Sequence, residues 1–321
     1  MRITLFYYLL YFTIFRKGLV LKFVTKNFIL LIGGFLLIME ANKLKELKLL
    51  CANVRIDILE MLMKFGQGHL GGSMSCVELF AVLYGKQLNV DPKNPKKEDR
   101  DQVVLSKGHA GPVWYSTLAE RGFFPKDWLF TLNQGGTLLP SHPDRTKTPG
   151  VDMTTGSLGQ GTSTAAGIAT AMKKRGLNSY TYLIVGDGEL NEGQCWEAFQ
   201  YIANYKLNNC IVIIDDNKRQ LDGYTKDVIN PFSYQEKMKA FGFYTLTAKG
   251  DDLEAIDDTI NKLKEVKDSA VCMVLDSVKG QGVKFFEELL SNHSVKFNEE
   301  YTNEANKAIA QLKEYIAQEG E

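Results

Sequence analysis

The chain has 321 residues, 45% of them apolar, and 38 Lys and Arg residues balance 38 Asp and Glu residues. A formal net charge of zero gives no basic excess for a nucleic-acid partner and no charged tail, so we expect neither. The five cysteines form no CxxC pair, which argues against a zinc ribbon and indicates free thiols in a reducing cytoplasm.

Residues 1–38 differ in amino-acid composition from the rest of the chain. They are aromatic, aliphatic and sparsely basic, and their two apolar runs are each shorter than the roughly 18–20 residues that span a bilayer. Two interpretations remain open: translation begins at Met39, or the segment anchors the chain to a membrane. We favour the first, and expect a hydrophobic N-terminal extension at 1–38 outside the mature fold and a single domain at 39–321.

Hydrophobic periodicity predicts the elements of that domain in chain order. Apolar residues at helical spacing predict a helix from about Leu44 to Phe65, which Gly66 should end, and a second helix over Cys76–Gln87. The expected strands are the apolar runs Val103–Leu105, Thr181–Val185, Cys210–Ile214, Phe243–Thr247 and Val271–Leu275. The expected later helices are Gly161–Lys174, Glu192–Tyr205, Leu253–Val266 and Glu300–Gln318. This alternation predicts an α/β fold, a parallel β-sheet with helices on both faces, with ligands beyond the carboxyl ends of its strands.

Polar residues follow two neighbouring strands of the predicted sheet. Gly186-Asp187-Gly188 comes directly after one strand, and Asp215-Asp216-Asn217 ends the next. Because the carboxyl ends of parallel strands meet at one edge, we expect the Asp187 carboxylate and the Asn217 amide oxygen to lie close together. Both are hard oxygen ligands suited to Mg²⁺ or Ca²⁺, and the glycines leave room for a phosphate to approach the backbone. The alternative, a simple turn and a helix cap, is disfavoured by the pairing of the two motifs.

The chain has four histidines, and each lies in a stretch rich in Gly, Pro or Ser: His69, His109, His142 and His293. A lone histidine is usually structural. Four in loop-like contexts indicate a site, because loops on a rigid scaffold are where catalytic groups concentrate.

The string GDGELNEGQCWEA, followed by IVIIDDNKRQLDG, resembles the transketolase family of thiamine-diphosphate enzymes. The resemblance runs from about Lys43 to Val295, and five further segments agree in chain order: FGQGHLGGS, SKGHA, LPSHP, TGSLGQG and VKGQGV. It implies the thiamine-diphosphate-binding (PP-type) fold. It also implies that Asp187, Asn217 and the backbone carbonyl of Arg219 bind Mg²⁺ or Ca²⁺, which bridges to the cofactor's diphosphate.

The resemblance further implies roles for individual side chains. His69 and His142 would bind the donor sugar's hydroxyls and act in catalysis with His293, while Glu192 would lie at a subunit boundary and help to link two active sites. The implied cofactor-binding residues are His109, Gly156, Leu158, Gly188, Asn217, Lys279 and His293. The chain departs from the family at Ser294, where Gly is usual, and at Leu70-Gly71-Gly72, where a Pro-containing stretch is usual. We therefore expect a different acceptor preference.

In this family, the glutamate that activates the cofactor's pyrimidine and the arginines that grip sugar phosphate lie in a second domain. No such domain is recognisable in the 321 residues. The resemblance therefore implies the N-terminal subunit of a split transketolase, with a C-terminal subunit carrying the pyrimidine-binding domain as its partner in an α₂β₂ assembly. The implied activity moves a two-carbon ketol unit from a ketose phosphate to an aldose phosphate, as in the pentose phosphate pathway.

Other functions remain open on the sequence. They are the α-chain of a 2-oxo-acid dehydrogenase, a deoxyxylulose-phosphate-type synthase, and a scaffold that keeps the fold without the chemistry. The paired His69 and His142 favour transketolase over the first two. The presence of both Asp187 and Asn217 disfavours the scaffold.

Overall fold

The computed structural model describes residues 21–320, and the chain divides into two compact units, 1–46 and 47–321. Helix α2 (Leu21–Phe65) ends where Gly66 adopts a φ of 89°, as predicted for its C-terminus. Among the described residues, no helix is long and apolar enough to cross a membrane. The predicted extension at 1–38 falls partly outside the described residues, so its role and the domain boundary at residue 39 stay predictions.

A parallel sheet forms the centre of the second unit. Within residues 21–320 its five strands lie in the order β2-β3-β4-β8-β7, and every neighbouring pair is parallel. The strands are β2 (Gln102–Leu105), β3 (Thr181–Gly186), β4 (Cys210–Asp216), β7 (Phe243–Lys249) and β8 (Ala270–Asp276). Each predicted strand is therefore confirmed, because strands buried on both faces are continuous apolar runs in the sequence.

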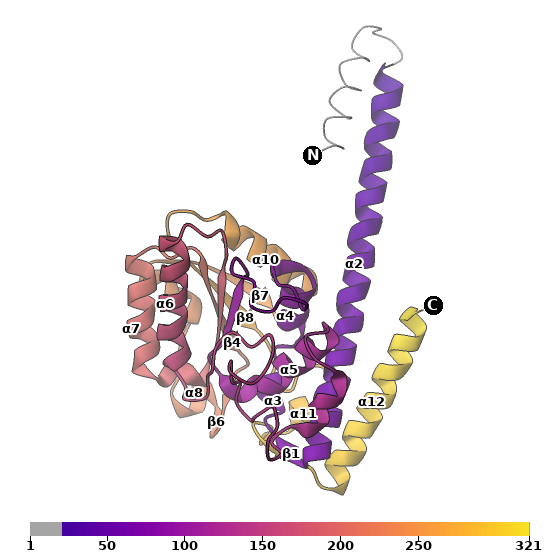
Figure 1. Cartoon of the computed structure of the whole chain (residues 1–321), viewed down its shortest axis with the longest axis vertical. Helices are drawn as coiled ribbons and strands as arrows, with labels where there is room; N and C mark the ends of the chain where they lie inside the picture. The colour runs from indigo at the N-terminus through magenta and orange to yellow at the C-terminus, as the bar shows by residue number, and fades with distance from the viewer. Residues whose placement is uncertain (1–20, 321) are drawn as a thin grey trace. The chain divides into compact units, whose positions relative to one another are not determined.

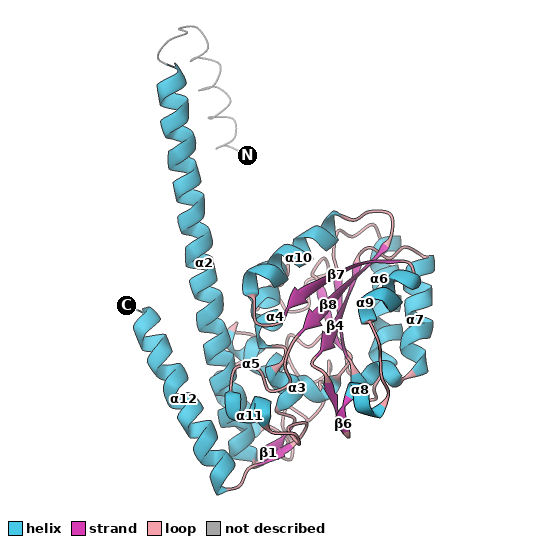
Figure 2. Cartoon of the chain, turned by 180° about the vertical axis from the view of Figure 1, so that it is seen from behind, coloured by secondary structure: helices cyan, strands magenta, loops and turns pink. Residues whose placement is uncertain are grey.

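Helices cover both faces of this sheet, as predicted (Figures 1 and 2). One face carries α6 (Gln160–Lys174), α7 (Gly193–Asn204) and α9 (Tyr234–Ala240); the other carries α4 (Val77–Val82) and α10 (Leu253–Glu265). Alternate strand residues face the first layer, so one hydrophobic core joins the sheet to α6, α7 and α9. Its fully buried members include Val104, Leu183, Val212, Cys272, Ala165, Phe199 and Met238.

One long helix of the structure has no predicted counterpart. Helix α5 (Gly111–Glu120) is buried at every residue from Gly111 to Ala119, and its Trp114 donates to the Tyr84 hydroxyl at 2.6 Å. A helix that is buried all round shows no amphipathic period, so its sequence carries no helical signal. The predicted helix over Cys76–Gln87 is correct in position, but its second half, Leu83–Gln87, is a π-helical turn.

One short antiparallel pair joins two of the loops that carry histidines. It consists of β1 (Gln67–Gly68) and β9 (Val295–Lys296). Further elements are α3 (Gly71–Met74), α8 (Thr225–Val228), α11 (Lys284–Glu288), the long C-terminal helix α12 (Glu299–Gly320), and the antiparallel pair of β5 (Arg219–Gln220) with β6 (Gly223–Tyr224). In the first pair Gly68 lies opposite Val295, which brings the His69 loop next to the His293 loop.

Candidate active site

The predicted metal ligands lie at the ends of two neighbouring strands. β3 pairs with β4 so that Gly186 lies opposite Asp215, and the Asp187 backbone N–H donates to the Asp215 carbonyl at 3.1 Å. Asp187 and Asn217 therefore follow the same edge of the sheet, at the carboxyl ends of its strands. This is the edge at which open α/β sheets bind ligands.

Asp187 has one carboxylate oxygen without a hydrogen-bond partner. The residue is 3% exposed, its Oδ1 accepts the Gly188 N–H at 2.8 Å, and its buried Oδ2 has no partner within residues 21–320. Burial, together with the negative charge of Asp215, raises the pKa of Asp187 to about 7. A buried acceptor without a donor is costly, and a bound divalent cation would remove that cost. The Asp187 carboxylate therefore fits a metal ligand.

Asn217 and Arg219 supply the other two predicted ligand atoms. Asn217 Nδ2 donates to Asp215 Oδ2 at 2.8 Å, and its Oδ1 accepts the Arg219 N–H at 3.2 Å. The Arg219 carbonyl accepts from Lys279 Nζ at 3.0 Å. Carboxylate, amide and carbonyl oxygens together are a donor set that hard cations prefer. In the described part of the chain, no cluster of three or more His, Cys, Asp or Glu could hold a metal.

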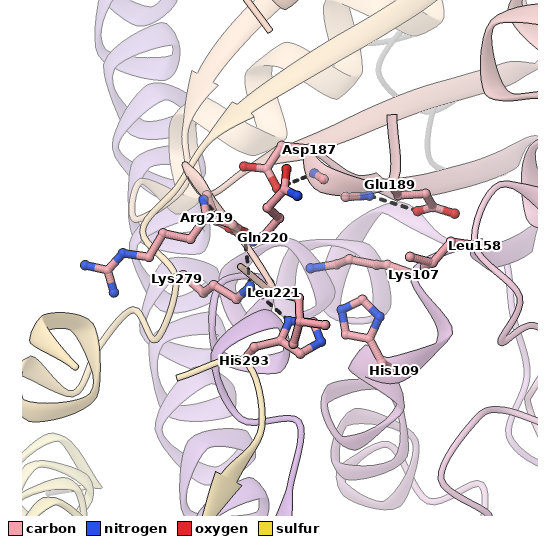
Figure 3. A pocket seen from close by; sticks show the side chains of 13 residues that line it. Lys107, His109, Leu158, Asp187, Glu189, Arg219, Gln220, Leu221, Lys279 and His293 are labelled. Carbon is pink, nitrogen blue, oxygen red and sulfur yellow. Dashed lines mark hydrogen bonds between the residues drawn. The ribbon is translucent and has the colours of Figure 1, made fainter. Parts of the chain in front are cut away.

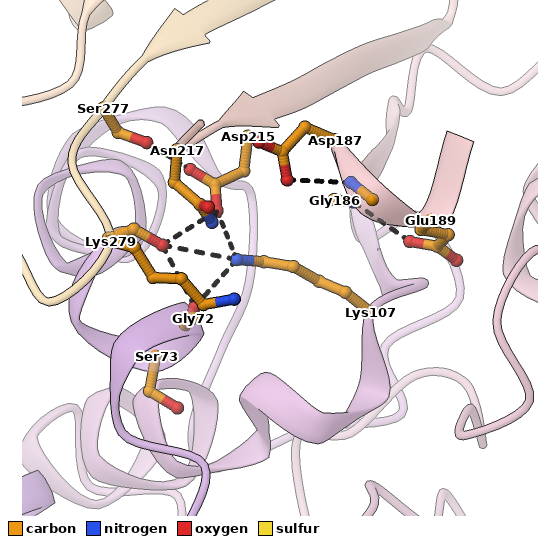
Figure 4. Close-up of polar contacts among 12 residues, drawn as sticks. Gly72, Ser73, Lys107, Gly186, Asp187, Glu189, Asp215, Asn217, Ser277 and Lys279 are labelled. Atoms are coloured by element: carbon orange, nitrogen blue, oxygen red, sulfur yellow. Dashed lines mark hydrogen bonds and ion pairs between the residues drawn. The ribbon is translucent and has the colours of Figure 1, made fainter. Parts of the chain in front are cut away.

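A buried ion pair lies beneath these ligands. Lys107 Nζ lies 2.5 Å from Asp215 Oδ2, and the two side chains are 1% and 0% exposed. The same Nζ donates to the Gly72 carbonyl at 2.7 Å (Figure 4). Burial acts to raise the pKa of Asp215, but the Lys107 charge and the hydrogen bonds outweigh it and the pKa is lowered. The pair joins the loop after β2 to the end of β4 and to α3.

All four histidines meet at one place, although they come from loops more than 200 residues apart at the extremes. The His69 ring centroid lies 5.3 Å from those of His109 and His293 and 6.1 Å from that of His142. The His109 and His293 centroids are 4.8 Å apart. The prediction that the four histidines share a site is therefore matched by their geometry, while the role of each one stays a prediction.

Burial favours the neutral form of these histidine rings. It lowers the pKa of all four, and for His293 burial and the nearby Lys279 lower it to about 3. Lys279 Nζ lies 3.1 Å from His293 Nδ1, so a protonated Lys279 donates to that nitrogen. The remaining His293 nitrogen then carries the proton and can donate to a ligand.

A cavity of about 190 Å³ opens between the strand ends and the histidine loops (Figure 3). It is lined by Lys107, His109, Leu158, Gly186, Asp187, Gly188, Glu189, Asn217, Arg219, Gln220, Leu221, Lys279 and His293. Its lining thus includes the three predicted metal-ligating residues and every predicted cofactor-binding residue except Gly156. Gly156 is not part of this lining, and a Cβ there would be 3.3 Å from Cγ of His142.

Glu192 lies apart from this cavity. It is exposed and precedes the first residue of α7. Within residues 21–320, it is not part of the cavity lining. Its predicted role at a subunit boundary stays a prediction.

Sequence reasoning missed four residues that line the cavity: Lys107, Glu189, Gln220 and Leu221. Lys107 and Glu189 lie inside the strings SKGH and GDGEL, in which only His109, Asp187 and the two glycines, Gly186 and Gly188, were predicted to have a role. Gln220 gives a structural reason for one glycine. A Cβ on Gly188 would lie 2.6 Å from Cβ of Gln220, so the β5–β6 hairpin already requires glycine at this position. The predicted contact of the Gly188 backbone with the cofactor stays a prediction.

Comparison with known families and curated proteins gives a consistent result. The family model for the transketolase thiamine diphosphate binding domain matches residues 47–314. The chain is 43% identical, over 77% of its own length and 90% of the relative, to the 6-deoxy-6-sulfo-D-fructose transketolase subunit SqwG of Clostridium sp. (strain MSTE9). It is 41% identical, over 68% of its length and 79% of the relative, to a subunit of the apulose-4-phosphate transketolase of Actinobacillus succinogenes.

Solved structures show the same likeness over a smaller share of longer chains. A transketolase mutant from Pichia stipitis has a TM-score of 0.73 at 26% identity, covering 86% of this chain and 45% of that one. The transketolase from Campylobacter jejuni has a TM-score of 0.76 at 28% identity, covering 82% and 43%. The chain therefore spans less than half the length of these solved transketolases.

Proposed function

The chain belongs to the transketolase family, and from that premise we propose that it is the diphosphate-binding subunit of a split transketolase. Two facts support the split. Relatives that it matches over most of their length are named as subunits, whereas the solved transketolases are more than twice as long as the matched part. The proposed partner is a separate C-terminal subunit with the pyrimidine-binding domain, in an α₂β₂ assembly.

The proposed reaction moves a two-carbon ketol unit from a ketose phosphate to an aldose phosphate, with thiamine diphosphate and a divalent metal, Mg²⁺ or Ca²⁺. The observation that carries this proposal is the unpartnered, buried Oδ2 of Asp187 beside Asn217. Asp187, Asn217 and the Arg219 carbonyl would hold the metal ion. When bound, thiamine diphosphate supplies the carbanion chemistry that breaks the carbon–carbon bond next to a ketose carbonyl.

Residues of this chain would bind the cofactor and the sugar, orient them, and transfer protons. Lys279 places a cation at the cavity, beside a Gly-rich turn in which Gly280 has a φ of 90°. The Gly280 and Gly282 N–H groups already donate to the Gly71 carbonyl and to Glu287, so the Lys279 side chain is the group that would meet an anion. Leu158 supplies an apolar wall that excludes water. His69 and His142, as neutral rings, can both accept from and donate to sugar hydroxyls and move protons near neutral pH.

The proposal also includes a subunit contact, a cellular compartment and a pathway. Glu192 would contact a neighbouring subunit, and its exposure directly before α7 supports this proposal. All five cysteines are free and buried, which supports a reducing compartment, the cytoplasm. The pentose phosphate pathway is the proposed context.

The names of the two relatives suggest which donors to test first. One name specifies a sulfonated ketose and the other a phosphorylated one. Both groups are anionic, so we propose a ketose with an anionic group as donor, with the ketose phosphates of the pentose phosphate pathway as the first members.

The decisive experiment combines reconstitution with donor screening. The purified chain alone should show no ketol transfer, and adding a chain with the pyrimidine-binding domain should restore it. Robust turnover by this chain alone would refute the split. Ketose phosphates and 2-oxo acids are then compared as donors; a clear preference for 2-oxo acids would replace transketolase with the dehydrogenase alternative.

A further inference from the structure

Glu189 is a buried carboxylate that no predicted role uses. It is 3% exposed. Its Oε1 accepts from Ser106 Oγ at 2.5 Å and from the Gly159 N–H at 2.8 Å, while its Oε2 accepts from the Gly186 N–H at 3.0 Å. A buried charge is tolerated when each of its oxygens is hydrogen-bonded, and both oxygens here are.

The three donors come from three separate loops of the cavity. Ser106 follows β2 and begins the loop that carries His109. Gly159 follows Leu158, which lines the cavity, and Gly186 is the last residue of β3, directly before Asp187. Glu189 thus connects the histidine loop, the Leu158 loop and the metal-ligand turn through one side chain.

The packing around these bonds leaves little room for adjustment. A Cβ on Gly161 would lie 2.5 Å from Ser106 Oγ, and a Cβ on Gly159, whose φ is 82°, would lie 2.8 Å from the Gln194 side chain. The start of α6 therefore fits against Ser106 and Gln194 with glycine at positions 159 and 161. Small shifts of the Glu189 carboxylate would be transmitted directly to Leu158.

Glu189 also completes the N-terminus of α6. Gly159 is the residue before this helix and has no side chain to cap it, and its N–H is taken by the Glu189 carboxylate. A negative charge at this end of a helix is favourable because it opposes the helix dipole. The capping role fixes where the helix begins, and hence where Leu158 lies (Figure 3).

From these contacts we infer that Glu189 is a positioning residue, which holds the Leu158 loop and the metal-ligand turn at a fixed separation so that the cavity is preformed for thiamine diphosphate. The identity of the ligand rests on the proposed function; the loop restraint does not. Glu189 acts through Gly159, Ser106 and Gly186 rather than by touching a reacting atom.

The first test measures the restraint itself, without any ligand. Glu189→Gln keeps the size of the side chain but has one acceptor oxygen and an NH₂ group, which must face at least one of the three donors. In hydrogen exchange on the full chain, the segment 155–161 should exchange about tenfold faster or more in this variant. The β8 segment, 270–276, should be unchanged. Glu197→Gln, at an exposed position of α7, is the matched control and should change neither segment.

The second test measures cofactor binding. By calorimetry on the chain combined with a chain that carries the pyrimidine-binding domain, with Mg²⁺ present, Glu189→Gln should weaken thiamine diphosphate binding by about tenfold or more, and Glu197→Gln should not. Ser106→Ala removes one of the three donors with a smaller risk to folding, and should weaken binding by a smaller factor in the same direction.

Each possible result of these two tests either supports or overturns the proposed role of Glu189. Unchanged exchange in segment 155–161 overturns it, and so does faster exchange in 155–161 and 270–276 alike, which would mean a general structural role. Faster local exchange with full cofactor affinity also overturns the positioning claim. If the unsubstituted chain combined with a chain that carries the pyrimidine-binding domain binds no thiamine diphosphate, the proposed function fails at its cofactor, while the exchange experiment still decides whether Glu189 restrains the loop.

Discussion

The Asn217 side-chain amide donates to Oδ2 of Asp215 at 2.8 Å, and this contact decides which way the amide oxygen faces. Asp215 also accepts from Ser75 Oγ, from Lys107 Nζ and, at its other oxygen, from Ser277 Oγ (Figure 4). An ionised carboxylate can only accept, so Asn217 must present its nitrogen to Asp215 and keep its oxygen on the other side. The orientation of a predicted metal ligand thus depends on the buried Lys107–Asp215 ion pair.

Breaking that ion pair should destabilise the fold strongly. Asp215→Asn leaves Lys107 buried without a charged partner, so the free energy of unfolding should fall by about 3–5 kcal/mol. Lys107→Met alone should also cost stability, but the double variant should lose less than the sum of the two single losses, because no unpaired charge remains. Denaturant titration of all four proteins measures this. Glu236→Gln, in an exposed pair with Lys239, is the control and should cost no more than about 0.5 kcal/mol. Strictly additive losses would show that Lys107 and Asp215 do not stabilise each other.

Replacing the unpartnered carboxylate should separate metal binding from stability. Asp187→Asn keeps the shape of the side chain but removes the charge that a divalent ion needs, so thiamine diphosphate affinity in the presence of Mg²⁺ should fall about 100-fold or more. The free energy of unfolding should not fall by more than about 1 kcal/mol, because the lost charge is buried and incompletely hydrogen-bonded. Calorimetry and denaturant titration give the two readings, with Asp258→Asn on the exposed side of α10 as the control. Full cofactor affinity in Asp187→Asn would remove Asp187 from the metal site.

The four histidines should divide into two functional pairs. In the part of the chain that the structure describes, His109 and His293 line the cavity while His69 and His142 do not. His69→Ala and His142→Ala should therefore lower kcat/KM for the sugar donor by about 10²–10⁴-fold and leave thiamine diphosphate affinity nearly unchanged. His109→Ala and His293→Ala should weaken cofactor binding. Steady-state kinetics of the reconstituted enzyme and calorimetry on the same variants give the comparison; equal loss of cofactor affinity in all four would contradict the division.

The metal-ligand turn could be predicted from sequence because its position follows from the sheet. A fully apolar strand of five or six residues identifies β3 and β4, parallel pairing puts their carboxyl ends together, and the polar motifs that follow contain Asp187 and Asn217. The family resemblance then supplied the third ligand, the Arg219 carbonyl, which no local pattern distinguishes.

The residues that hold the metal ligands in position could not be predicted in this way. Asp215 receives its hydrogen bonds from Ser75, Lys107 and Ser277, which are 140, 108 and 62 residues away in sequence. Polar residues in loops have no period, so only the tertiary fold shows that they converge. The role of Glu189 could not be predicted for a related reason. Two of its three donors are backbone N–H groups, which every residue except proline carries, so they leave no mark in the sequence.

A carboxyl group remote from the proposed site should make stability depend on pH. Asp57 on α2 is buried; its Oδ1 lies 2.8 Å from Lys126 Nζ, and its Oδ2 has no hydrogen-bond partner among the residues described. Burial is the largest influence on its pKa and raises it to about 7; Lys126 opposes this shift, and Glu120, which shares Lys126, adds to it.

The sign of the effect follows from proton binding. Between about pH 4 and pH 7 the folded Asp57 keeps a proton that the unfolded chain releases, because the unfolded carboxyl has a pKa near 3.9. Asp57 therefore favours folding at low pH, and this contribution is lost as the pH rises through about 7. Asp57→Asn removes the titration. Its free energy of unfolding, relative to the unsubstituted chain, should thus rise by about 2–3 kcal/mol from pH 5 to pH 8. Denaturant titrations at several pH values measure this difference. For the control Asp258→Asn, the difference in free energy of unfolding from the unsubstituted chain should not change with pH. If the difference for Asp57→Asn stays constant or falls as the pH rises, the Asp57 carboxyl is already ionised in the folded protein at pH 5.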